Sequence, residues 1–181
     1  MKPKLIICGH GRHGKDTMAG YLVDVHGFTA VASSIFAAEK LVFPLLKEKY
    51  GYKTATECFH DRYSHRAEWF NIISNYCREN PSKLTQEIFK ESDIYVGLRN
   101  RAELEASRKY CDVVIWVDRS RHLAPENKDS NEITPEMCDV IIDNNGTLEE
   151  FYDKIDKFLI WKYYGKDDVL ASIDGLDSWG K

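Results

Sequence analysis

A glycine-rich turn lies close to the start of the chain, between a short apolar run and a helical pattern. Residues 9–17 read Gly-His-Gly-Arg-His-Gly-Lys-Asp-Thr and follow the apolar residues 5–8. Glycines let the backbone curl so that successive N–H groups point inward, and the positive N-terminal end of the following helix adds to their charge. Lys15 supplies a further, mobile positive charge. These residue types at this spacing predict a loop that binds the phosphates of a nucleotide.

The residues after this lysine depart from the usual pattern of phosphate-binding loops. Asp16 stands where serine or threonine normally offers a hydroxyl to magnesium, and Thr17 comes one position later. A carboxylate can hold Mg²⁺ directly or through water, so we expect these two residues to hold the metal. The loop residues expected to contact ATP are Gly9, Gly11, Arg12, His13, Gly14, Lys15, Asp16 and Thr17. The alternative is a strand-to-helix turn that has no ligand.

A second group of residues with binding chemistry lies between positions 61 and 69. Placed on one helix, Arg62, Arg66 and Trp69 fall at i, i+4 and i+7 and share a face. Guanidinium groups bind phosphate through paired hydrogen bonds, and an indole stacks on a base. The three residues are therefore predicted to bind the molecule that receives the phosphoryl group. That acceptor would be a nucleotide, either free or part of a strand. For Trp69 taken alone, packing in the core is the more common outcome.

Two carboxylates and one arginine join Lys15 as predicted catalytic residues. An alcohol acceptor benefits from a positioned carboxylate, whereas a phosphate acceptor needs no deprotonation at neutral pH. Asp61 and Asp16 are the candidate bases. Arg119 directly follows a predicted strand, where an arginine can close over a triphosphate and stabilise developing charge. The acidic residues later in the same loop, Glu126 among them, are interpreted as solvated surface.

The composition indicates one globular domain with its own core. The chain has 181 residues and a net charge of −4, which gives no general attraction to nucleic acid, so contact with DNA would need a local patch. Its five cysteines are odd in number and form no C-x-x-C pair, which argues against a disulfide framework and against zinc. We find no signal peptide and no stretch of about 20 apolar residues, and therefore expect a cytoplasmic protein without membrane contact.

Apolar runs alternate with helical patterns along the chain. Strands are expected at residues 4–8, 28–32, 93–97, 112–118 and 139–143. Helices are expected at about 14–26, 35–50, 64–80, 81–91, 101–110 and 147–163, with Ser33 or Ser34 capping the second and Asn80-Pro81 beginning the fourth. The alternation predicts an α/β fold, a parallel sheet flanked by helices, whose ligands gather at the carboxyl ends of the strands.

With these residues in view, the chain resembles a small P-loop kinase of the nucleoside-monophosphate-kinase type. The run Gly-Lys-Asp-Thr at residues 14–17 is similar to that of phage deoxynucleoside monophosphate kinases. Residues 138–150 resemble the last strand and helix of those enzymes and of dephospho-CoA kinases. That resemblance implies that Asn145 and Gly146 lie against the adenine of ATP.

Another stretch occupies the place of an Asp-Val-Arg…Glu element in these kinases. It consists of residues 95–99 followed by Glu103 or Glu105, and the resemblance implies a catalytic role for Arg99. Gly97 stands where the element has its aspartate, so the usual carboxylate behind the magnesium is missing.

The acceptor region, residues 61–69, looks closer to compact phage kinases that phosphorylate 5-hydroxymethyluracil already in DNA. The resemblance implies ATP- and Mg²⁺-dependent transfer to a pyrimidine deoxynucleotide unit in the host cytoplasm. The hydroxymethyl group of 5-hydroxymethyluracil in DNA is the favoured acceptor, and a free deoxynucleoside monophosphate is the alternative. A dephospho-CoA-like kinase and a non-kinase, ATP-dependent switch are further alternatives.

The expected organisation is one kinase domain over residues 1–163 and a C-terminal tail over residues 164–181. Within the domain we expect a helical, acceptor-binding insertion at about 54–91 and a lid loop at about 119–137, which shows no apolar period. The sequence does not indicate an oligomeric state.

Overall fold

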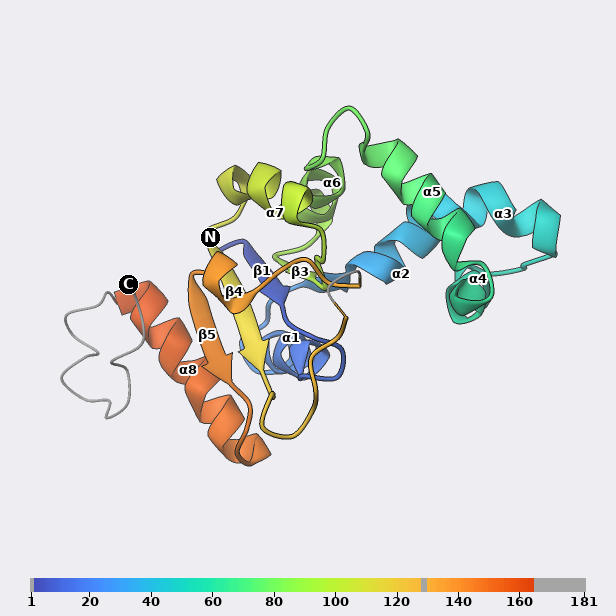
Figure 1. Cartoon of the computed structure of the whole chain (residues 1–181). Coiled ribbons are helices and arrows are strands. Elements are labelled where there is room, and N and C mark those ends of the chain that lie inside the picture. The colour runs from blue at the N-terminus through green and yellow to red at the C-terminus, as the bar shows by residue number, and fades with distance from the viewer. Residues whose placement is uncertain (1, 128–129, 165–181) are drawn as a thin grey trace.

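The computed structural model describes residues 2–127 and 130–164, which contain a five-stranded sheet (Figure 1). The strands are β1 Leu5–Cys8, β2 Ala30–Ala32, β3 Ile94–Val96, β4 Val113–Asp118 and β5 Val140–Asp143. Their order is β2-β3-β1-β4-β5, and every neighbouring pair is parallel. The predicted α/β fold with a parallel sheet is confirmed. Because all strands run the same way, the loops after their carboxyl ends gather at one edge.

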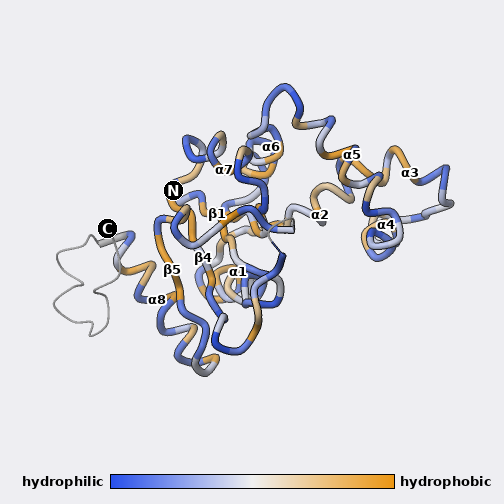
Figure 2. The backbone as a smooth tube through the Cα atoms, in the orientation of Figure 1, coloured by the Kyte–Doolittle hydropathy of each residue, from blue (hydrophilic) through white to orange (hydrophobic). Residues whose placement is uncertain are grey.

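The central strand β1 is buried on both faces, and its residues alternate between two apolar cores. The helices that cover the sheet are α1 Lys15–Asp24, α6 Lys83–Glu91, α7 Arg101–Ser107 and α8 Leu148–Tyr164. Leu5 and Ile7 pack in one core with α1 and α8, whereas Ile6 and Cys8 pack in the other with α6 and α7. Figure 2 shows hydrophobic and hydrophilic residues alternating along α8, as expected for a helix with one buried side.

The helices between β2 and β3 include an arm, residues 33–77, with a third apolar core. The arm consists of α2 Ser33–Ala37, a π-helical turn Ala38–Val42, α3 Phe43–Tyr50, α4 Ala55–His60 and α5 Arg66–Cys77. Its core includes Val42, Leu46, Cys58 and Trp69, none of which belongs to the two cores of the sheet. Figure 1 shows α3, α4 and α5 standing away from the sheet.

Two predicted helix starts are wrong. The helix expected from residue 35 begins at Ser33, so neither this serine nor Ser34 caps it. Helix α6 begins at Lys83, two residues later than expected, because Asn80 Oδ1 accepts the Ser82 N–H at 3.1 Å and holds a turn ahead of the helix.

The described part of residues 119–137 is tied to the rest of the molecule. Ile133 is 1% exposed and Asn131 is 5% exposed, and the Asn131 amide donates to the Gly9 carbonyl oxygen at 3.4 Å. The stretch thus contributes a buried residue although it shows no apolar period, since one isoleucine among charges and prolines leaves no period to detect. Lys128, Asp129 and the expected tail from residue 165 onward lie outside the described residues.

All five cysteines are free thiols. Within residues 2–127 and 130–164, no helix combines the length and the apolar character that a bilayer crossing requires.

Candidate active site

The glycine-rich turn joins β1 to α1 at the carboxyl edge of the sheet. Gly9 has φ +142° and Gly14 has φ +105°, conformations that side chains rarely adopt. A Cβ on Gly9 would come within 2.7 Å of the Val117 carbonyl oxygen, so β4 leaves no room for a side chain there. Arg12, at φ 64°, also lies in the left-handed region. The loop therefore has the curled backbone that presents N–H groups to an anion.

Lys15 begins α1 with its ammonium group inside the turn. The side chain is buried, and Nζ donates to the His10 carbonyl oxygen at 2.6 Å. Burial, followed by the positive charge of Arg99, lowers the pKa of Lys15. A phosphate placed beside a desolvated cation of this kind would stabilise its charge, which agrees with the predicted role of Lys15 in binding phosphate.

The turn after β5 is fastened to the glycine-rich turn by Asn144. The Asn144 side-chain Nδ2 donates to the backbone carbonyl oxygen of His13 at 2.9 Å, and the Asn144 backbone carbonyl oxygen accepts from Arg119 Nη1 at 2.8 Å. An added Cβ on Gly14 would overlap this amide, so the glycine also makes room for the contact. The guanidinium group of Arg119, which is predicted to close over a triphosphate, is hydrogen-bonded to Asn144. Asn145, which is predicted to lie against adenine, donates to the Asp118 carboxylate at 3.0 Å.

A carboxylate lies inside the glycine-rich turn. Glu126 Oε2 accepts the backbone N–H of Gly11 at 2.6 Å, and its Oε1 accepts from Arg99 Nη1 at 2.9 Å. The Glu126 N–H donates to His10 Nδ1 at 3.3 Å. Burial alone would raise the pKa of Glu126, but the bonds from Arg99 and Gly11 outweigh it and hold the pKa below its usual value. The interpretation of Glu126 as solvated surface is wrong.

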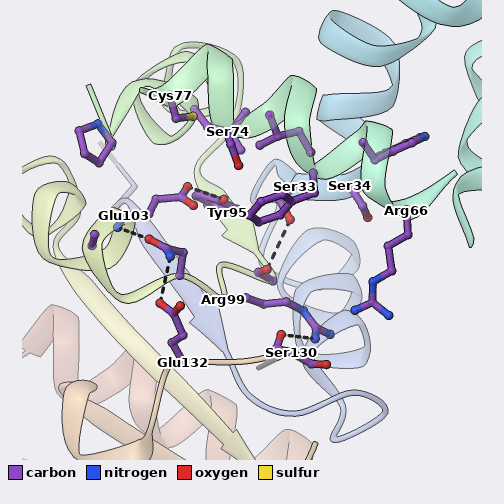
Figure 3. Close-up of a pocket in the computed structure, with 18 residues that line it drawn as sticks. Ser33, Ser34, Arg66, Ser74, Cys77, Tyr95, Arg99, Glu103, Ser130 and Glu132 are labelled. Carbon is purple, nitrogen blue, oxygen red and sulfur yellow. Dashed lines mark hydrogen bonds between the residues drawn. The ribbon is translucent and has the colours of Figure 1, made fainter. Parts of the chain in front are cut away.

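Two cavities open beside the turn and share a wall. The anion cavity, about 670 Å³, is lined by residues that include Gly11, Arg12, Lys15, Asp16, Arg62, Tyr63, Arg66, Arg99 and Glu126. The aromatic cavity, about 530 Å³, is lined by residues that include Trp69, Phe70, Ile73, Leu84, Tyr95, Asn100 and Glu103 (Figure 3). Both are also lined by Ser33, Ser34, Arg66, Trp69, Gly97, Arg99 and Ser130. Five cations face two carboxylates in the anion cavity, which therefore favours an anionic ligand.

The three predicted acceptor residues all line the anion cavity, although they do not share one helix face. Arg62 belongs to a 3₁₀ turn, Asp61–Tyr63, and α5 begins at Arg66. The Arg62 guanidinium lies 3.9 Å from the centre of the Phe59 ring. Trp69 is 6% exposed and packs in the core of the arm, yet it lines both cavities. The core-packing and site interpretations of this tryptophan are thus compatible.

The two candidate bases differ in position. Asp16 is exposed and lines the anion cavity. Asp61 accepts from the Tyr52 hydroxyl at 2.7 Å and lies 3.1 Å from His65 Nε2. Tyr52 is the largest cause of the lowered pKa of Asp61. Asp61 is absent from the lining of both cavities, so a base role is geometrically simpler for Asp16.

The predicted metal ligands Asp16 and Thr17 are both exposed on the first turn of α1. Among residues 2–127 and 130–164, no three His, Cys, Asp or Glu side chains gather closely enough to hold a metal ion by themselves. If a nucleotide brings Mg²⁺ on its phosphate oxygens, the exposed Asp16 carboxylate could hold that ion directly or through water.

No protein-family model matches the sequence, and neither does any curated protein. Solved structures do share the architecture. The Thermus thermophilus protein TT1252 is similar with a TM-score of 0.52 and 14% identity, over 91% of this chain and 100% of that one. Shikimate kinase from Acinetobacter baumannii in complex with shikimate gives 0.49 and 15%, over 91% and 94%. An APS kinase from Mycobacterium tuberculosis gives 0.44 and 14%, over 87% and 97%.

The chain shares the parallel α/β fold of TT1252. At such identities the likeness concerns the fold alone, and any activity has to be argued from the site itself.

Proposed function

We propose that the protein is an ATP-dependent kinase that transfers the γ-phosphate to a pyrimidine deoxynucleotide unit. The favoured acceptor is the hydroxymethyl oxygen of 5-hydroxymethyluracil in DNA. One observation carries the proposal: Lys15 of the glycine-rich turn and three arginines, Arg62, Arg66 and Arg99, line one cavity, and a second cavity that contains Trp69, Phe70 and Tyr95 shares a wall with it. Phosphates and a base would each find matching chemistry there.

The nucleotide would be held by the P-loop backbone and Lys15, and it would supply the phosphoryl group. Arg99 and Arg66 line both cavities, so their guanidinium groups can neutralise charge that develops between donor and acceptor. Asp16 would take the proton of an alcohol acceptor or support Mg²⁺.

Exposed aromatic side chains at the cavities favour an acceptor within a strand. Tyr63, which lines the anion cavity, is 73% exposed, and Phe70, which lines the aromatic cavity, is 69% exposed. Exposed rings beside arginines can stack on bases that flank the reacting one. The net charge of −4 restricts such contact to this local patch.

A free deoxynucleoside monophosphate is the second candidate, because the pair Arg62 and Arg66 could also hold its 5′-phosphate. The dephospho-CoA-like alternative is weaker, since Asn144 in the turn on which it depended serves to fasten the P-loop. The switch alternative depends on a tail that lies outside the described residues. Removing residues 165–181 should leave single-turnover phosphoryl transfer nearly unchanged if the protein is a kinase.

The acceptor can be identified by offering ATP labelled on the γ-phosphate together with two substrates. One is a short oligonucleotide that contains 5-hydroxymethyluracil, and the other is the corresponding free nucleoside monophosphate. We expect label in the oligonucleotide. Label only in a nucleoside diphosphate would exclude the DNA acceptor, and label in neither would refute the kinase proposal for this substrate class.

A further inference from the structure

Two carboxyl groups, Glu103 and Glu132, line the aromatic cavity, and its exposed surface is otherwise mostly apolar. Trp69, Phe70, Leu84 and Tyr95 contribute apolar surface, and Figure 3 shows Glu103 beside Tyr95 at the cavity. Nothing in the phosphate chemistry of the neighbouring anion cavity uses the Glu103 carboxyl group. Its position instead concerns the part of the acceptor that lies away from the phosphates.

Three elements of the structure hold Glu103 in place. It lies in the first turn of α7, where its N–H donates to the side chain of the N-cap residue Asn100 at 2.9 Å. Tyr95, on β3, donates its hydroxyl to Glu103 Oε1 at 2.8 Å. Thr85, on α6, makes a further side-chain hydrogen bond and is itself 2.7 Å from Ser107 Oγ. A carboxyl group fixed in this way can read the edge of a ligand.

The carboxyl group of Glu103 keeps its proton to a higher pH than an exposed glutamate does. Burial raises the pKa of Glu103 to about 7, although the hydrogen bonds from Tyr95 and Thr85 act in the opposite direction. The titratable groups that interact with it are Tyr95 and the thiols of Cys8 and Cys77. Among residues 2–127 and 130–164, no ion pair with Glu103 is formed.

Two arginines, Arg66 and Arg99, line the cavity, and neither forms an ion pair with Glu103 in the described part of the chain. Arg99 binds the Glu126 carboxylate at 2.9 Å, and Arg101 binds Glu105 at 2.8 Å. Glu132 accepts from the backbone N–H of Arg101 at 2.8 Å. Glu103 is therefore not neutralised by a cation in the wall, and a ligand that closes the cavity would favour its neutral form further.

We propose that Glu103 is a specificity-determining residue that reads the imide edge of a uracil-type ring in the aromatic cavity. A neutral carboxyl group donates through its O–H and accepts through its C=O, which matches a ring carbonyl next to a ring N–H. A carboxylate can accept only, and it repels the ring carbonyl. The inference rests on the proposed function for the assignment of the phosphate end to the anion cavity and for the choice of a uracil-type ring.

The first test measures acceptor binding as a function of pH. Calorimetry with 5-hydroxymethyl-2′-deoxyuridine 5′-monophosphate, and with a short oligonucleotide bearing the same base, should give an affinity that falls as pH rises through about 7. Glu103→Gln keeps a donor and an acceptor but cannot titrate, so its affinity should be flat over this range. Glu105→Gln is the matched control, because this exposed residue lies on the same helix, and it should retain the wild-type profile.

The second test removes the hydrogen-bond donor of the ring, its N3–H group. With the N3-methyl form of either probe, the wild type should bind at least about tenfold more weakly, whereas Glu103→Ala should bind both forms alike. Equal wild-type binding of the two forms, or a pH profile that Glu103→Gln leaves in place, would overturn the inference. If the glutamine variant does not fold, Tyr95→Phe takes its place. Its loss of the hydrogen bond that lowers the pKa of Glu103 must move the midpoint of the binding profile to higher pH.

The outcomes separate this inference from the proposed function. Binding that depends on Glu103 without any phosphoryl transfer would remove the kinase proposal and keep the ring site. Transfer with an unchanged pH profile in Glu103→Gln would do the reverse. If neither probe binds to the folded protein, both proposals fail.

Discussion

The carboxylate of Glu126 accepts a hydrogen bond from the backbone N–H of Gly11, 2.6 Å away, inside the P-loop. The two residues are 115 positions apart in sequence. A phosphate bound by this loop would use the same kind of donor, and Arg99 binds the other carboxylate oxygen. The carboxylate would thus compete with a bound phosphate for these donors.

Replacing this carboxylate should strengthen nucleotide binding. We expect Glu126→Gln to bind ATP about two- to fivefold more tightly at neutral pH, the range for removing a partly exposed charged competitor. Because the pKa of Glu126 is lowered, its carboxylate stays charged at neutral pH and down through the pH range in which an ordinary glutamate is protonated. The charge is lost only as the pH falls through the lowered pKa. The difference between variant and wild type should therefore vanish in acid. Calorimetric titration with ATP measures it, and Glu136→Gln, on the same segment but exposed, is the control. Weaker binding by Glu126→Gln would show that the carboxylate assists the nucleotide.

Lys15 should be indispensable for transfer. Its buried ammonium is the cation that α1 places inside the loop, so Lys15→Ala should lower kcat by about a thousandfold or more. Single-turnover assays measure the loss, and thermal unfolding should show that the fold persists. Lys47→Ala, at an exposed site on α3, should behave as wild type. Substantial residual transfer in Lys15→Ala would contradict the phosphate role.

The two candidate bases can be compared directly with an alcohol acceptor. Asp16 lines the anion cavity and Asp61 does not, so Asp16→Asn should lower kcat by about a hundredfold and Asp61→Asn by much less. Asp61→Asn should instead weaken the fold of the arm, because Tyr52 loses a charged partner. The comparison requires kcat and the unfolding midpoint of both variants. The opposite ranking of kcat would assign the base to Asp61.

Asn144 should couple the last turn to the P-loop. Asn144→Ala removes a buried hydrogen bond to the His13 carbonyl oxygen, which should destabilise the protein by about 1–3 kcal/mol. We also expect weaker ATP binding, because the loop loses a tether. Denaturant unfolding and calorimetry measure the two effects, with Asn71→Ala at an exposed position as the control. Unchanged stability would mean that water replaces the amide without loss.

Features that depend on neighbouring residues were accessible from the sequence. The glycine-rich turn, the apolar strands and the parallel sheet all follow from local patterns, since each strand of a buried parallel sheet reads as an apolar run. Helix α4 also had a local signal that the prediction missed. Thr54 accepts the Glu57 N–H at 3.1 Å, and threonine followed three positions later by glutamate is a typical helix start.

Contacts between distant segments could not be read in this way. Glu126 and Asn144 reach the P-loop over more than 100 positions, and neither residue type differs from what an exposed turn would contain. The raised pKa of Glu103 likewise comes from the way β3, α6 and α7 pack around it. Arg62 and Arg66 were predicted to share one helix face. Both line the anion cavity, but Arg62 belongs to a 3₁₀ turn and not to the helix that begins at Arg66.

The arm at residues 33–77 has an apolar core separate from those of the sheet. Damage to that core can therefore remove acceptor recognition while the sheet and the nucleotide loop survive. Variants of this kind would accumulate to normal levels and still engage nucleotide. A screen that measures only protein abundance would not detect such variants, although the proposed phosphoryl transfer would be lost in them.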